Sequence, residues 1–194
     1  MNGEIVRYLT SRLLAEREAS RVSTFIAAID GRCGSGKTTV ARAVAAQLEI
    51  PLIHMDDFFL RPEQRTQERL ASPGENVDHE RFLEEALIPL SQGKGCRYGR
   101  FDCSSMEIRE TVQLDPAPLV LVEGSYSHHP LLRPYLDLTV FLNVSPEEQT
   151  ARILARNGRE ALNAFQKRWI PLEEAYFKAY SVPERADICL YNGI

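Results

Sequence analysis

Short apolar runs alternate along the chain with longer segments whose apolar residues have helical spacing. Residues 1–22, 39–48 and 81–90 show helical spacing, and a further helix should begin at Pro146 with Ser145 as its N-cap. We expect buried strands at residues 25–29, 52–54, 119–122, 138–144 and 188–191. Strands that alternate with helices in this way pack into a parallel sheet covered by helices on both faces. The pattern therefore predicts an α/β fold.

Three segments are less regular. Residues 61–78 contain Pro62, Pro73 and Gly74 among polar side chains, which is typical of a mobile loop. Pro89 lacks a backbone N–H, so we expect a kink near the end of the helix at 81–90. Residues 94–115 are polar with scattered apolar positions, and we expect a hairpin insertion there.

Length and composition narrow the class of protein. With 194 residues, of which 44% are hydrophobic, the chain suits a single domain, 1–194, with an ordinary core. The net charge is −4 and no run of Lys or Arg occurs, so we expect no nucleic-acid partner. The four cysteines form no CxxC pair, which favours reduced thiols in a cytoplasmic protein. Frequent charges near the N-terminus argue against a signal peptide or a membrane span.

The most specific signal is a glycine-rich stretch that matches G-x-x-x-x-G-K-[ST] at every fixed position, follows an apolar strand and opens a helix. Backbone N–H groups in such a loop surround phosphate oxygens, and the helix N-terminus adds its positive end. Lys37 is suited to the β- and γ-phosphates and Thr38 to Mg²⁺. We expect Cys33 to be a bystander thiol and not a redox switch. The predicted ATP-binding residues are Gly31, Cys33, Gly34, Ser35, Gly36, Lys37, Thr38 and Thr39.

Binding a nucleoside triphosphate does not define the reaction, because switches, motors and kinases share this loop. The chain has no NKxD guanine signature. A small-molecule kinase needs a carboxylate near the γ-phosphate, a second acid for Mg²⁺, and arginines that close over the transferred group. Asp56 and Asp57 follow the second predicted strand and Glu123 follows the third, so all three are candidates for the acidic roles.

Four further stretches resemble one enzyme family. They are HMDDFFLRP at 54–62, ENVDHERF at 75–82, LVLVEGSY at 119–126 and ARILARNGRE at 151–160. Their order is that of the uridine kinase and phosphoribulokinase family of P-loop kinases, and the resemblance extends to nicotinamide riboside kinases. It implies a P-loop NTPase fold, a three-layer α/β/α sandwich with a five-stranded parallel sheet, the small hairpin insertion and a lid at 152–170.

Carried over position by position, the resemblance assigns roles to single residues. Asp56 would be the general base that accepts the proton of a primary hydroxyl, and Lys37 would act on the transferred phosphoryl group. Glu123 would bind Mg²⁺ together with Thr38. Asp78 would accept hydrogen bonds from ribose hydroxyls. Phe58 and Phe59 would form an apolar wall for a substrate ring or, as the alternative, belong to the core. The remaining substrate contacts would be Phe101 and Tyr126.

The lid implied by the resemblance carries three arginines. Arg152 and Arg156 are four residues apart on one helix face, where they would stabilise charge on the transferred phosphoryl group. Arg159 would contact ATP, and Gly158 offers a hinge. Trp169 is most simply a core residue.

Some residues depart from the family pattern. Uridine kinases carry a pyrimidine-binding histidine in the hairpin, where this chain has Met106, so recognition of a base is left open. His128 and His129 have no counterpart in the family. The side chains of adjacent residues point apart in a strand, so we expect no metal ion between these two histidines.

The sequence thus favours an ATP- and Mg²⁺-dependent kinase that phosphorylates a primary hydroxyl of a nucleoside or related ribosyl metabolite, with uridine and cytidine as first candidates. One alternative is a nicotinamide riboside kinase or another vitamin or sugar kinase. A second alternative is an ATP-dependent switch or assembly protein without small-molecule kinase activity. The oligomeric state, including a homo-oligomer, is left open.

Overall fold

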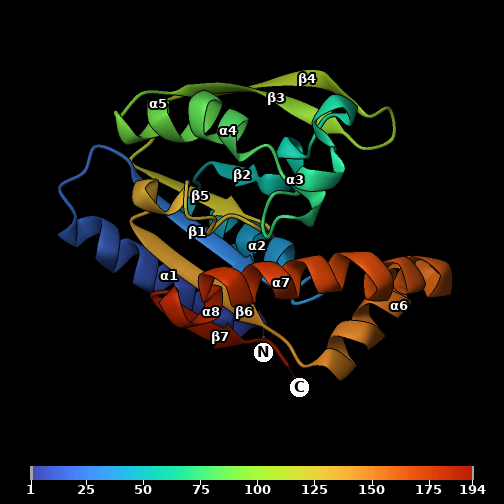
Figure 1. Cartoon of the computed structure of the whole chain (residues 1–194). Coiled ribbons are helices and arrows are strands. Elements are labelled where there is room, and N and C mark those ends of the chain that lie inside the picture. Colours follow the sequence, from blue (N-terminus) through green and yellow to red (C-terminus); the bar gives the residue numbers. More distant parts are fainter. Residues whose placement is uncertain (1, 194) are drawn as a thin grey trace.

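The computed structural model describes residues 2–193 and has the predicted parallel sheet at its centre (Figure 1). The strands lie in the order β2-β5-β1-β6-β7, and each neighbouring pair is parallel. Their bounds are β1 Phe25–Gly31, β2 Leu52–His54, β5 Leu119–Glu123, β6 Leu138–Asn143 and β7 Ile188–Tyr191. Every residue of β1 and β5 is buried, as expected for strands covered on both faces. The predicted three-layer α/β/α fold is confirmed.

Helices cover the sheet on both sides through two separate hydrophobic clusters. On one face, α1 (Asn2–Ala19) and α2 (Lys37–Leu48) contribute Leu9, Leu13 and Val40, among others. On the other face lie α7 (Ile170–Tyr180) and α8 (Val182–Arg185), together with the helical segments around Phe82. Successive residues of β1 belong alternately to the two clusters, because side chains along a strand alternate between the faces of the sheet.

The predicted hairpin at 94–115 is present as β3 (Cys96–Asp102) and β4 (Glu107–Leu114), which pair antiparallel and lie at the edge of the molecule with α4 and α5 (Figure 1). The helix expected at 81–90 is more irregular than a single kink. It consists of α4 (His79–Phe82), a π-helical turn (Leu83–Leu87) and α5 (Ile88–Ser91). Pro89 cannot donate a backbone hydrogen bond to the preceding turn, which fits this irregularity.

The segment 61–78, expected to be a mobile loop, contains two short helices. They are a 3₁₀ turn (Pro62–Gln64) and α3 (Gln67–Ala71), which Thr66 caps by accepting the N–H of Arg69. The Arg69 guanidinium also donates to the carbonyl oxygens of Glu75 and Val77. One side chain therefore satisfies two backbone carbonyl groups, and the segment contains more helical structure than the sequence predicts.

The helix predicted to begin at Pro146 is α6 (Pro146–Ala164), and the Ser145 hydroxyl accepts the N–H of Glu148 as its N-cap. Gly158, the predicted hinge, interrupts this helix with φ 80° and ψ 174°. A π-helical segment (Phe165–Trp169) then leads into α7. None of the helices within residues 2–193 combines the length and the apolar character needed to cross a membrane.

Candidate active site

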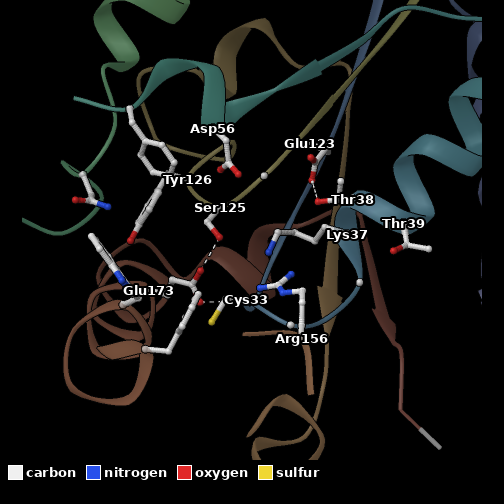
Figure 2. Close-up of a pocket in the computed structure, with 17 residues that line it drawn as sticks. Cys33, Lys37, Thr38, Thr39, Asp56, Glu123, Ser125, Tyr126, Arg156 and Glu173 are labelled. Carbon is white, nitrogen blue, oxygen red and sulfur yellow. Dashed lines mark hydrogen bonds between the residues drawn. The ribbon is translucent and has the colours of Figure 1, made fainter. Parts of the chain in front are cut away.

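A cavity of about 370 Å³ lies where the carboxyl ends of β1, β2 and β5 meet. Because these strands are parallel neighbours, the residues that follow them come together at one edge of the sheet. Figure 2 shows Lys37, Thr38, Asp56 and Glu123 gathered on one side of this cavity, with Tyr126 and Glu173 opposite. Four segments that are distant in sequence thus form one site.

The phosphate loop links β1 to α2 and forms the floor of the cavity. Gly34 and Gly36 have φ values of 75° and 92°, which residues with a side chain rarely adopt. The Lys37 ammonium donates to the carbonyl oxygens of Gly31 at 2.6 Å and Arg32 at 3.0 Å, so it lies over the loop. Cys33, Gly34, Gly36, Lys37, Thr38 and Thr39 line the cavity, whereas Gly31 and the buried Ser35 lie behind it.

Thr38 and Glu123, the two predicted Mg²⁺ ligands, are brought together. The Thr38 hydroxyl donates to Oε2 of Glu123 at 3.2 Å, and both residues line the cavity. Hydroxyl and carboxylate oxygens are the hard donors that Mg²⁺ prefers, so the residues present fit this ion. Nδ1 of His54 lies 2.5 Å from the other Glu123 oxygen, and this hydrogen bond raises the pKa of His54. His54 was not predicted as a site residue, although it ends β2 directly beside this edge.

The two aspartates after β2 point in different directions. The Asp56 side chain is exposed and lines the cavity. Partial desolvation of its carboxyl group, and after it the charge of Glu123, raises the pKa of Asp56. Asp57 is buried on the far side, where it accepts the Tyr98 hydroxyl at 3.3 Å and pairs with the Arg100 guanidinium at 3.2 Å. Asp56 is therefore positioned to meet a bound molecule, and Asp57 ties the hairpin to the sheet.

The three lid arginines do not act together in this structure. Arg152 donates to the carbonyl oxygen of Asn192 at 2.7 Å and, at longer distances, to those of Gly34 and Ser35, so it braces the phosphate loop from behind. Arg156 lines the cavity. Arg159 is exposed and does not line it.

Three predicted substrate contacts do not reach the cavity. Phe58 is fully buried against Phe82 and Tyr98 in the core, and its neighbour Phe59 lines the cavity instead. The two consecutive side chains face opposite ways, and the packing of the 3₁₀ turn Met55–Phe58 determines that Phe58 faces the core and Phe59 the cavity. Phe101 is buried in the hairpin and is absent from the cavity wall. These predicted roles require correction.

Asp78, the predicted ribose contact, is also engaged elsewhere. It caps α4 by accepting the Arg81 N–H at 3.1 Å, and it accepts the side-chain amide of Gln64 at 2.8 Å. Asp78 is 2% exposed and does not line the cavity. Asn76, two residues earlier, does line it, as does the predicted contact Tyr126. In this structure Asp78 is a helix cap and not a cavity residue.

Glu173 is a central cavity residue that the sequence did not reveal. Its buried carboxylate accepts the backbone N–H of Cys33 at 2.9 Å and the Ser125 hydroxyl at 2.6 Å. Burial, and after it Glu173, raises the pKa of Cys33, which disfavours the reactive thiolate. No local pattern distinguishes Glu173 from other helix glutamates, because its role depends on how α7 docks against the phosphate loop.

Trp169 was expected in the core but is half-buried and lines the cavity together with Phe165. Both residues lie on the π-helical segment that follows the break at Gly158. The insertion of an extra residue in a π turn rotates the side chains that follow, so helical spacing alone misplaces them. Two aromatic side chains therefore form an apolar part of the cavity wall, and one of them, Trp169, was predicted in the core.

No family model matches the chain. A uridine kinase from Staphylococcus epidermidis is 27% identical over 188 residues, covering 88% of this chain and 88% of that protein. A uridine-cytidine kinase B from Dictyostelium discoideum is 27% identical over 87% of this chain and 75% of its own length.

Solved structures show the same fold. A structure from Bacillus stearothermophilus described as a possible uridine kinase has a TM-score of 0.72 and 20% identity, and the match covers 96% of this chain and 97% of that one. A structure from a Silicibacter species described as a putative fructose transport system kinase has a TM-score of 0.68 and 20% identity, with 95% and 98% covered. The sequence matches and the fold support the resemblance of this chain to uridine kinase-like P-loop kinases.

Proposed function

We propose that the protein transfers a phosphoryl group from ATP to a primary hydroxyl of a nucleoside or related ribosyl metabolite. The observation that carries the proposal is the convergence of a phosphate loop, a Thr38–Glu123 oxygen pair and the Asp56 carboxylate on one cavity. A switch or an assembly protein has no need of a carboxylate such as Asp56 beside the transferred phosphate. A kinase requires one, to receive the proton of the acceptor hydroxyl.

The cavity residues have separate roles in the proposed reaction. The loop N–H groups and Lys37 hold and orient the β- and γ-phosphates, and Thr38 and Glu123 would hold Mg²⁺, which neutralises phosphate charge when bound. Asp56 accepts the hydroxyl proton as the new O–P bond forms. Its raised pKa makes it a stronger base than an ordinary aspartate. Arg156, on the cavity wall after β6, is available to stabilise charge on the transferred group.

The cavity wall favours an uncharged acceptor. Asp56, Glu123 and Glu173 contribute three carboxylates, and the lining cations are Lys37 and Arg156, which the phosphates of ATP engage. A phosphorylated acceptor would meet uncompensated negative charge, whereas a hydroxylated one finds hydrogen-bond partners. Uridine and cytidine are the first candidates, because the curated relatives carry the names uridine kinase and uridine-cytidine kinase.

A second candidate is a sugar or vitamin kinase, such as a nicotinamide riboside kinase. The specific observation in its favour is that Asp78, the ribose contact implied by the family, is occupied as a helix cap. Asn76 and Tyr126 take its place on the wall and carry no preference for a pyrimidine.

The test is a coupled assay of ADP release with Mg²⁺ and ATP over nucleosides, nicotinamide riboside, pantothenate, hexoses and pentose phosphates. Asp56→Asn serves as the matched control, since it keeps the size of the side chain but removes the base. We expect turnover with one hydroxylated, uncharged acceptor, and a decrease of about 10²–10⁴-fold in the variant with ATP affinity retained. Tight ATP binding with no acceptor-dependent ADP release would favour the switch instead. Near-normal turnover of Asp56→Asn would remove Asp56 from the mechanism.

A further inference from the structure

Glu75, His79 and His129 form a cluster outside the cavity. Glu75 and His79 lie just before and at the start of α4, and His129 lies in the turns that follow β5. The two imidazole rings are stacked, with centroids 4.0 Å apart and planes 12° from parallel. One ligand atom from each of the three side chains lies within 4.8 Å of the others. Two segments that are distant in the chain thus bring two imidazoles and one carboxylate close together.

Three of the four ring nitrogens of the two histidines make no hydrogen bond. Neither ring nitrogen of His79 makes a hydrogen bond, and neither does Nε2 of His129, although both side chains are almost completely buried, at 0% and 4% exposure. A buried polar atom without a partner costs free energy, about 1–3 kcal/mol in proteins. Two such histidines side by side therefore indicate a partner that is not part of the chain.

We propose that Glu75, His79 and His129 bind a divalent transition-metal ion of the zinc class. The Glu75 oxygens lie 3.1 Å from Nε2 of His79 and 3.8 Å from Nε2 of His129. Ligands at about 2.0–2.2 Å from a tetrahedral zinc ion are separated from one another by about 3.3–3.6 Å, so the two spacings from Glu75 bracket the required ones. The Glu75 side chain is 25% exposed, which leaves a path for the ion and a position for water as the fourth ligand.

Binding requires small adjustments of the rings. The lone pairs of parallel stacked rings do not converge, so the two rings would tilt apart around the ion. Nδ1 of His129 accepts the Leu131 N–H at 3.3 Å, so the neutral ring carries its proton on Nε2. The ion replaces that proton, which moves to Nδ1 at the cost of this long contact.

The ligand types separate this site from the Mg²⁺ site at Thr38 and Glu123. Imidazole nitrogen suits zinc and its neighbours in the transition series, whereas Mg²⁺ selects oxygen. The surrounding structure is closely packed: a Cβ at Gly74 would lie 2.9 Å from the His129 ring, and Tyr180 packs edge-on against that ring. An ion here would join two segments whose neighbouring residues, Asn76 and Tyr126, line the cavity. The site would therefore brace the acceptor wall.

The experiment is a titration of the full-length protein with Co²⁺ followed by visible absorption, and then displacement by Zn²⁺ to obtain affinities. A Cys103→Ser/Cys189→Ser background removes the two exposed thiols, which could bind these metals themselves. Glu75→Gln removes one ligand. Glu80→Gln is the matched control, because Glu80 is a neighbouring exposed carboxylate that pairs with Arg69 and lies outside the cluster. His79→Gln is the second ligand variant.

We expect one Co²⁺ per chain with the intense visible bands of a tetrahedral site and no thiolate charge-transfer band, and Mg²⁺ should not compete. Glu75→Gln and His79→Gln should each weaken Zn²⁺ binding by more than about 100-fold, since losing a ligand costs more than losing a supporting contact. Glu80→Gln should bind as the parent does. Absence of a tetrahedral spectrum in the parent protein, or equal affinities in Glu75→Gln and Glu80→Gln, would overturn the proposal. The parent spectrum decides the matter even where a variant fails to fold.

Discussion

Arg152 and Arg156 lie one helical turn apart on α6, and replacing each by methionine should separate stability from turnover. Methionine retains a long apolar side chain but removes the charge and the donors. Arg152 makes one short hydrogen bond, 2.7 Å to the Asn192 carbonyl oxygen, and longer ones to the phosphate loop. Arg156 is exposed, and its one hydrogen bond within the described residues is to the adjacent Asn157. The two residues therefore differ in what they support.

The magnitude for Arg152 follows from these contacts. A hydrogen bond from a charged donor contributes about 1.5–3 kcal/mol, and we reduce this to about 1–2 kcal/mol because the side chain is 33% exposed. For a chain of this size each kcal/mol shifts Tm by about 2–4 °C, so Arg152→Met should lower Tm by roughly 2–8 °C. Arg156→Met should change stability by less than about 0.5 kcal/mol.

Turnover should respond in the opposite order. Removing a group that stabilises the transferred phosphoryl group costs about 10²–10³-fold in kcat, which we expect for Arg156→Met. Thermal unfolding followed by circular dichroism measures the first effect, and ADP release with the acceptor found in the screen measures the second. If Arg156→Met lowered Tm more than Arg152→Met, or left kcat unchanged, the division of roles would be wrong.

Three further results are expected. Because desolvation raises the pKa of Asp56, the acidic limb of kcat/KM should lie at higher pH than an ordinary aspartate would give; a flat acidic limb in His54→Gln, which removes the neighbouring imidazole, would contradict Asp56 as the base. Gly31→Ala should lower the free energy of unfolding by on the order of 4 kcal/mol or more, because Gly31 has φ 141° and a Cβ there would lie 2.1 Å from a β6 carbonyl oxygen. Gly3→Ala is the control, because a Cβ at Gly3 would meet nothing within 4 Å, and denaturant unfolding compares the two variants. The single tryptophan, Trp169, lines the cavity, so its fluorescence should change when ATP is added, and an unchanged spectrum would place it elsewhere.

The local patterns of the sequence were enough to predict the strands, the hairpin, the helix cap at Ser145 and the phosphate loop. Each of these depends on residues close together in the chain: alternation in a strand, glycines at positive φ, or a hydroxyl before a helix. The convergence of Asp56 and Glu123 followed from the parallel sheet, because neighbouring parallel strands end at the same edge. This part of the site could therefore be predicted without a structure.

Tertiary packing decided the rest. Phe59 faces the cavity instead of Phe58 because of how the turn after β2 packs against the core. Asp78 caps α4 and does not line the cavity. Glu173 reaches the phosphate loop only through the docking of α7.

The histidines show the same division between sequence and structure. His128 and His129 do point apart, as their adjacency predicts: the Nε2 atom of His128 lies 3.2 Å from the Ala28 carbonyl oxygen. His129 instead meets His79, from a distant segment. The sequence thus determined the elements and the phosphate-binding chemistry, because these depend on local backbone and residue type. Only the tertiary structure decided which side chains share a space, because that depends on how distant segments pack.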